Sequence, residues 1–182
     1  MTLRANAIQT LTEFIPPNDI QSQLRDRYLE HISTFADAFN KSCPPAHITV
    51  SALLFSADLT EIALTLHPKV GRWLQLGGHC EPNDSTLQSA AHRECAEESG
   101  LVDLEFVSQS PIQLDAHTIN CRGDGLVTHL DVQFALKLDA ATPSNLIISN
   151  ESLDLKWFAI DAIPQGCDQA LHSLIAAAQK TT

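Results

Sequence analysis

The stretch that decides the fold is Gly77–Leu101, GGHCEPNDSTLQSAAHRECAEESGL. Ser85, followed three residues later by Gln88, predicts a helix start, because such a pair can satisfy the unpaired backbone N–H groups of a first turn. Gly100 is typical of the position just past a helix C-terminus. The stretch therefore predicts a glycine-containing loop, a helix of about four turns and a second turn.

The predicted helix has an apolar face and an acidic face. The apolar face has helical spacing, and its two alanines allow close approach to a sheet; its members are Leu87, Ala90, Ala91 and Cys95. Glu94, Glu97 and Glu98 lie at positions i, i+3 and i+4, so their carboxylates share one patch of the remaining surface.

Three neighbouring carboxylates destabilise a helix unless a positive charge compensates them. Arg93 can reach Glu97 one turn away, but a single guanidinium cannot neutralise three acids. Hard oxygen ligands favour Mg²⁺, with Mn²⁺ as a possible substitute. The alternative is a solvated acidic surface, which the three glutamates alone leave open.

The surrounding pattern favours the metal site. The run from Arg93 to Leu101, RECAEESGL, matches R-E-U-x-E-E-x-G-U at every defined position, where U is apolar. It thereby resembles the second half of the Nudix box of the Nudix hydrolase family. In the first half, Gly78 and Asp84 keep the expected spacing, but Asp replaces Glu and the segment from Asp84 to Arg93 is one residue longer.

Two flanking segments extend the resemblance from about Ile48 to Pro164. Residues 73–79, WLQLGGH, look like the strand before the box in a subgroup with Gly-Gly-His at this point. Residues 153–164, LDLKWFAIDAIP, are similar to the closing strand of the family. A long gapped motif with several fixed acids is a far more specific signal than a lone glycine-rich loop.

The resemblance implies an α/β/α sandwich with a mixed sheet, whose box helix holds Mg²⁺ against a substrate diphosphate. It implies metal ligation by Glu94, Glu97, Glu98 and the backbone carbonyl of Gly77. Glu94 is also a candidate base, and Arg93 would orient the glutamates. Glu151 is the best positional match to a further acid beyond the box, with Asp139 and Asp154 as competitors.

The resemblance implies a metal-dependent hydrolase that cleaves a diphosphate linkage in a small molecule of the nucleoside-diphosphate type. A bound metal offsets the charge that repels an attacking water, and a nearby carboxylate accepts the proton of that water. The alternative is a catalytically weak or inactive Nudix-like module that binds or senses a nucleotide. That alternative predicts loss of a helix carboxylate, whereas all three are present.

Histidines form a second set of candidates. His129 and Asp131 share one face of a predicted strand, and His117 on the preceding strand could lie opposite. They could line the substrate pocket, hold a second metal or form a hydrogen-bonded pair on the sheet, which is the favoured interpretation. His79, His129 and Asp131 are carried forward as candidate substrate contacts.

The length predicts one domain over residues 1–182, divided into a helical N-terminal extension (1–45), a core (46–165) and a C-terminal helix (166–182). An amphipathic helix is predicted from Asn18 to Phe39, covering a sheet instead of forming a dimer interface. Strands are predicted over residues 47–55, 62–67, 73–76, 103–107, 112–119, 126–138 and 155–158. Either a monomer or a homodimer is compatible with this pattern.

The formal net charge of −11, without a cluster of Lys and Arg, argues against nucleic acid as a partner. The expected partner is a small phosphorylated substrate, whose charge a metal ion can balance locally. No apolar run is long enough for a membrane span, and no signal peptide is visible, so we expect a cytoplasmic protein. Five dispersed cysteines without a C-x-x-C pair are expected to be reduced and structural.

Overall fold

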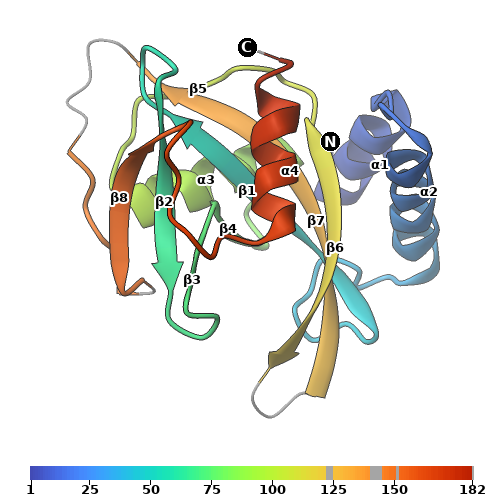
Figure 1. Ribbon diagram of the computed structural model, residues 1–182. Coiled ribbons are helices and arrows are strands. Elements are labelled where there is room, and N and C mark those ends of the chain that lie inside the picture. The colour runs from blue at the N-terminus through green and yellow to red at the C-terminus, as the bar shows by residue number, and fades with distance from the viewer. Residues whose placement is uncertain (122–124, 140–144, 151, 182) are drawn as a thin grey trace.

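A computed structural model describes residues 1–121, 125–139, 145–150 and 152–181. Its centre is a curled eight-stranded sheet with helices on both faces (Figure 1). The strands are β1 (Ala46–Phe55), β2 (Glu61–His67), β3 (Arg72–Leu74), β4 (Leu76–His79), β5 (Leu104–Phe106), β6 (Gln113–Cys121), β7 (Gly125–Leu138) and β8 (Asp154–Ala159). The helices are α1 (Leu3–Glu13), α2 (Asp19–Thr34), α3 (Leu87–Ser99) and α4 (Gln169–Ala178).

The sheet is mixed, as predicted. Its main path runs β3-β2-β1-β7-β5, while β4 pairs with β1, β6 with β7 and β8 with β2. The β1–β7 pair is parallel, and the other pairs are antiparallel. All ten residues of β1 are buried, because helices cover both faces of this central strand.

Alternate residues of β1 face two different hydrophobic clusters, which makes the molecule a sandwich. Ile48, Val50, Ala52 and Leu54 belong to the cluster that also holds the four buried apolar residues of α3. Leu53 and Phe55 belong to the cluster with Leu171, Leu174 and Ile175 of α4. The predicted α/β/α arrangement is confirmed.

The N-terminal helices differ from the prediction. The helix expected over residues 18–39 ends at Thr34, although it begins as expected with the Asn18 side chain accepting a hydrogen bond from the Gln21 N–H. Ile20, expected on the buried face, is 69% exposed. Gln21 is buried instead, because its carboxamide bonds both the N–H and the carbonyl of Leu114 in β6. A sheet edge that needs partners for its polar groups thus overrides the apolar pattern.

Helix α1 was not predicted. It begins after Thr2, whose side chain accepts a hydrogen bond from the Ala5 N–H, and it buries Ala7 and Leu11 one turn apart. The Arg4 guanidinium donates to the carbonyls of Ile32 and Phe35 at the end of α2. This contact satisfies carbonyls that a helix C-terminus leaves unpaired, and it fixes α1 beside α2.

The single strand predicted over residues 73–76 is two strands. β3 pairs with β2, whereas β4 pairs with β1 and contains the Gly-Gly-His sequence itself. The chain therefore changes partner at Gln75, which carries β4 across to the central strand.

Within the described part of the chain, no helix has the length and apolar character required to cross a membrane.

Candidate active site

Helix α3 begins one residue later than the sequence suggested. Its N-cap is Thr86, not Ser85: the Thr86 hydroxyl accepts from the Ser89 N–H at 2.9 Å, and the Ser89 hydroxyl accepts from the Thr86 N–H at 3.1 Å. Asn6 of α1 accepts from the Leu87 N–H at 2.8 Å. Gly100 ends the helix with a φ of 72°, as predicted for a glycine at this position.

The acidic face of α3 lies against β4. The Gly77 N–H donates to Glu98 Oε2 at 3.0 Å, and Glu98 is only 8% exposed. At Gly77, with a φ of +156°, a Cβ atom would lie 2.5 Å from the Ser51 Cα. At Gly78 a Cβ would lie 2.7 Å from Glu94 Oε2. The two glycines therefore allow both the β1–β4 contact and the approach of the helix carboxylates.

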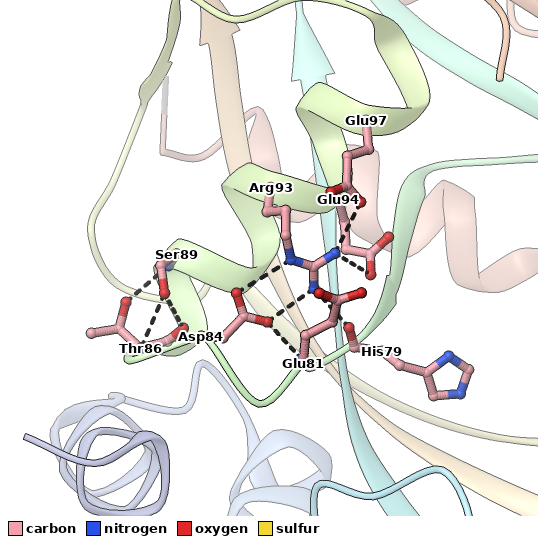
Figure 2. Close-up of polar contacts among 8 residues, drawn as sticks. All are labelled: His79, Glu81, Asp84, Thr86, Ser89, Arg93, Glu94 and Glu97. Carbon is pink, nitrogen blue, oxygen red and sulfur yellow. Dashed lines mark hydrogen bonds and ion pairs between the residues drawn. The ribbon is translucent and has the colours of Figure 1, made fainter.

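Arg93 is the centre of the polar network shown in Figure 2. Its Nη1 atom donates to Glu94 Oε1 and to Glu97 Oε2, both at 3.0 Å. Its Nη2 atom donates to the carbonyl of His79 at 2.9 Å. Because one nitrogen contacts both glutamates, their carboxylates are held close together beside the Gly-Gly-His strand.

Asp84 completes this network. It accepts from Arg93 Nη2 at 2.9 Å and Nε at 3.3 Å, and from the Glu81 N–H at 2.7 Å. Burial of Arg93 lowers its pKa, but bonds to Asp84 and Glu94 outweigh that effect and hold the pKa above its ordinary value. Arg93 therefore remains a fixed positive charge among the acids.

The three helix glutamates face one large cleft of about 1190 Å³. Residues of β4 and the loop to α3 form one wall, including Gly78, His79 and the segment 80–85. The N-terminal extension supplies another wall through residues 1–3, 36, 37 and 39–41. The cleft is therefore shared between the predicted core and the predicted extension.

The donor set of the cleft suits a hard divalent cation. Glu94, Glu97 and Glu98 all line it, and their donor atoms are carboxylate oxygens. Their exposure is graded: the side chain of Glu94 is 14% exposed and that of Glu97 is 59% exposed. Oxygen donors of this kind fit Mg²⁺ or Mn²⁺, so the residues present fit the ion that the resemblance implies.

Glu151, the predicted further acid, lies outside the described residues. Of its two competitors, Asp154 forms an ion pair with Lys156, and Asp139 donates its backbone N–H to the Asp103 carbonyl. Neither of them lines the cleft described here.

His79 belongs both to the cleft and to a cluster of histidines. The imidazole of His129 packs among those of His47, His79 and His117, with ring centroids 4.8, 5.3 and 5.3 Å away. Burial, followed by neighbouring histidines, lowers the pKa of His129 to about 3 and that of His47 to about 4. Both rings are therefore neutral at pH 7.

Asp131 lies within the sheet and does not line the cleft. It is 3% exposed, and its carboxylate accepts hydrogen bonds from Thr49, Ser51 and Gln133 at 3.0, 2.6 and 3.0 Å. The predicted H-x-D pair is therefore not a hydrogen-bonded pair: His129 faces other histidines, and Asp131 bonds hydroxyl and amide groups of β1 and β7.

The cysteines near the site are not activated nucleophiles. Cys80 and Cys95 are free thiols. Burial raises the pKa of Cys80 to about 12 and raises that of Cys95 as well. Because the thiolate is the reactive form, neither is suited to covalent catalysis at neutral pH.

The fold and the site together define a class: a mixed-sheet sandwich in which a glutamate-bearing helix packs against a Gly-Gly strand at a cleft. A model of the NUDIX domain matches residues 45–177. The chain belongs to the NUDIX family, and the prediction of a Nudix hydrolase, a pyrophosphohydrolase, is confirmed at the level of the enzyme class. None of the curated proteins matches the chain.

Solved structures share this fold. A NUDIX-family hydrolase from Clostridium perfringens has a TM-score of 0.56 and 22% identity, over 75% of this chain and 98% of that one. An Ap4A hydrolase from C. elegans has a TM-score of 0.57 and 19% identity, over 73% and 95%. The NUDIX domain of Shewanella oneidensis NrtR, complexed with ADP ribose, has a TM-score of 0.51 and 19% identity, over 83% and 96%.

Two residues at the site escaped the sequence analysis. Asn6 caps α3 from a helix that was not predicted. His47 joins the histidine cluster because its position in β1 is directly opposite His129 in the parallel β7. The alternation His47, Thr49, Ser51 along a strand was the available signal for His47, but the β1–β7 pairing was needed to place it.

Proposed function

We propose that the protein is a Mg²⁺-dependent hydrolase, with Mn²⁺ as a substitute, that cleaves the diphosphate linkage of a nucleoside-diphosphate-type small molecule. The observation that carries this proposal is the arrangement of Glu94, Glu97 and Glu98 around Arg93 and Gly77 at one cleft. The Gly-Gly-His sequence before the box also supports membership of the subgroup with that feature.

Glu94, Glu97 and Glu98 would hold the ion, together with the backbone carbonyl of Gly77. When bound, the ion supplies positive charge against the diphosphate and makes water more acidic. The side chain of Glu97 is the most exposed of the three, at 59%. Glu94 is held by Arg93 beside Gly78 and is the candidate acceptor of the proton from the attacking water.

Charge in the cleft supports a dependence on metal. Its described lining includes the acids Asp37, Glu81, Asp84, Glu94, Glu97 and Glu98, but only Lys41 and Arg93 as permanently cationic side chains. Arg93 already contacts three carboxylates. A polyphosphate would be repelled from this cleft unless cations accompanied it, so substrate binding itself is expected to require a divalent ion.

The experiment is a hydrolysis assay on ADP-ribose, dinucleoside polyphosphates, nucleotide sugars and nucleoside triphosphates. Each compound is incubated with Mg²⁺, with Mn²⁺ and with EDTA, and the nucleotide products are separated and identified. Cleavage of at least one compound with metal, abolished by EDTA, is expected. Tight metal-dependent binding without turnover of any compound would contradict the enzyme and favour the nucleotide-sensing module.

We also propose that the chain consists of an extension (1–45), a core (46–165) and a C-terminal helix (166–182), and that it is a monomer or homodimer located in the cytoplasm. The cleft walls formed by residues 1–3, 36, 37 and 39–41 support a role for the extension in substrate selection. No role for nucleic acid or a membrane is proposed.

A further inference from the structure

We propose that His47, His79 and His129 form a second metal site, selective for a borderline transition ion of the Zn²⁺ type and distinct from the glutamate site on α3. One ring nitrogen from each histidine lies within 4.8 Å of the other two. The inference does not depend on the proposed hydrolysis, because it concerns three imidazoles that the glutamate site does not use.

The sheet itself brings the three rings together. His47 in β1 is directly opposite His129 in the parallel strand β7. His79 in β4 is opposite Thr49, the next residue of β1 on the same face as His47. Three neighbouring strands thus present imidazoles to one point on one face, and their hydrogen bonding fixes the backbone positions before any ion binds.

The distances suit a small ion. The Nε2 atoms of His47 and His79 are 3.1 Å apart, and two nitrogen ligands of a tetrahedral zinc ion are separated by about 3.4 Å. The ring centroid of His47 lies 5.0 Å from that of His79 and 4.8 Å from that of His129. Only small side-chain rotations are needed to place three nitrogens around one ion.

One buried nitrogen of the cluster has no partner. The Nε2 atom of His129 is buried and makes no hydrogen bond to any of the described residues. Buried nitrogens without partners are unfavourable. Imidazole nitrogens are the commonest protein ligands for ions of the Zn²⁺ type.

The surroundings favour a cation of this class. All three ligands are imidazoles, which suit Zn²⁺, Co²⁺, Ni²⁺ and Cu²⁺, whereas Mg²⁺ prefers the oxygen ligands of α3. Asp131, two residues after His129 on the same face of β7, is buried and accepts hydrogen bonds from Thr49 and Ser51. His79 and His129 are only partly buried, and His79 also lines the cleft. A fourth coordination position therefore has access to water or substrate.

The test uses Co²⁺ as the probe, with the full-length protein in excess Mg²⁺ to occupy the glutamate site. Three imidazoles around Co²⁺ in a four-coordinate site give intense visible absorption, whereas Co²⁺ in an oxygen site is octahedral and weakly coloured. We expect the intense band to saturate at one equivalent of Co²⁺ and to disappear when Zn²⁺ is added. Absence of the band in the wild-type protein would overturn the proposal.

Variants assign the site. His129→Asn and His79→Asn are each expected to weaken Co²⁺ binding by at least about 10-fold, since even residues behind the metal ligands commonly contribute that much. His172→Asn, at an exposed position of α4, is the matched control and should bind like wild type. Glu97→Gln should also retain the band. Equal binding by His129→Asn, His79→Asn and wild type would reject the site.

A measurement on the unmutated protein covers the case in which a histidine variant fails to fold. In NMR spectra of imidazole C–H groups, substoichiometric Zn²⁺ should shift or broaden the resonances of His47, His79 and His129 before that of His172. Unchanged resonances for the first three histidines at one equivalent of Zn²⁺ would also overturn the proposal.

Discussion

Asp84 holds Arg93 through two nitrogens of the guanidinium, with Asp84 Oδ2 2.9 Å from Nη2 and Asp84 Oδ1 3.3 Å from Nε. The sequence departs from the family motif at this position, with Asp in place of Glu and a segment one residue longer before Arg93. The ion pair shows that the shorter acid still reaches the arginine, and the Glu81 N–H donates a further hydrogen bond to Asp84 Oδ2.

We therefore expect Asp84→Asn to reduce hydrolysis by about 10- to 100-fold, the range typical of residues that orient metal ligands. The carboxamide keeps the shape of Asp84 but removes the charge that holds Arg93 between Glu94 and Glu97. Steady-state rates at saturating Mg²⁺ measure the effect. The control is Asp26→Asn, because its exposed ion pair with Arg25 should contribute little. Equal rates for Asp84→Asn and wild type would remove Asp84 from the site.

The two glycines of β4 should respond differently to alanine. In Gly78→Ala, the new Cβ would meet the carboxylate of Glu94 at 2.7–2.8 Å, and the end of a flexible side chain can move away. We expect a folded protein with a stability loss below about 1 kcal/mol and a marked loss of activity, because Glu94 is displaced.

Gly77→Ala should instead disrupt the fold. Its Cβ would lie 2.5 Å from the Ser51 Cα and from the Val50 carbonyl oxygen, at a φ of +156°. Backbone atoms cannot move away as a side chain can, so we expect a stability loss of about 2 kcal/mol or more. Urea denaturation of both variants, with activity measured in parallel, separates the two effects. The same stability loss in both variants would contradict this account.

The position of the α3 cap gives a test of stability alone. Thr86→Ala removes the hydroxyl that accepts from the Ser89 N–H and should cost about 1 kcal/mol. Ser85→Ala, the change suggested by the sequence pattern, should cost less than about 0.5 kcal/mol because Ser85 is exposed and is not the cap. Thermal or urea unfolding measures the loss of stability in each variant. A larger loss for Ser85→Ala than for Thr86→Ala would show that Ser85 is the N-cap of α3.

The sequence was most informative where a periodic pattern and a local motif agreed. The buried face of α3 and its Gly100 terminus follow from spacing and from backbone conformational preference, both of which are local properties. The mixed sheet and sandwich were predicted through the resemblance, because strand order depends on pairing between distant segments that no local pattern records.

The features that the sequence did not predict depend on tertiary contacts. Gln21 is buried in place of Ile20 because the edge of β6 requires hydrogen-bond partners. Asp131 is an interior residue because Thr49 and Ser51 of β1 lie beside it, and this depends on the β1–β7 pairing. Helix α1 had a local sequence signal, because Thr2 is followed by Leu3, Ala7 and Leu11 at four-residue spacing. No local pattern indicates that Asn6 of this helix contacts α3.

The central claim is that the α3 glutamates perform metal-dependent hydrolysis, and Glu97→Gln tests it most directly. Glu97 is largely exposed, so the variant should fold like wild type, as circular dichroism can verify. Glu30→Gln, at an exposed position of α2, removes one negative charge elsewhere and serves as the matched control.

The decisive measurement is the turnover rate of wild type, Glu30→Gln and Glu97→Gln on the best substrate of the panel, with Mg²⁺ and with EDTA. The account predicts equal rates for the first two and a loss of about 100-fold or more for Glu97→Gln, because a lost metal ligand should cost at least as much as a residue behind the ligands, so that the rate approaches the residual rate in EDTA. A folded Glu97→Gln variant as active as wild type would contradict it and remove the glutamate helix from the mechanism.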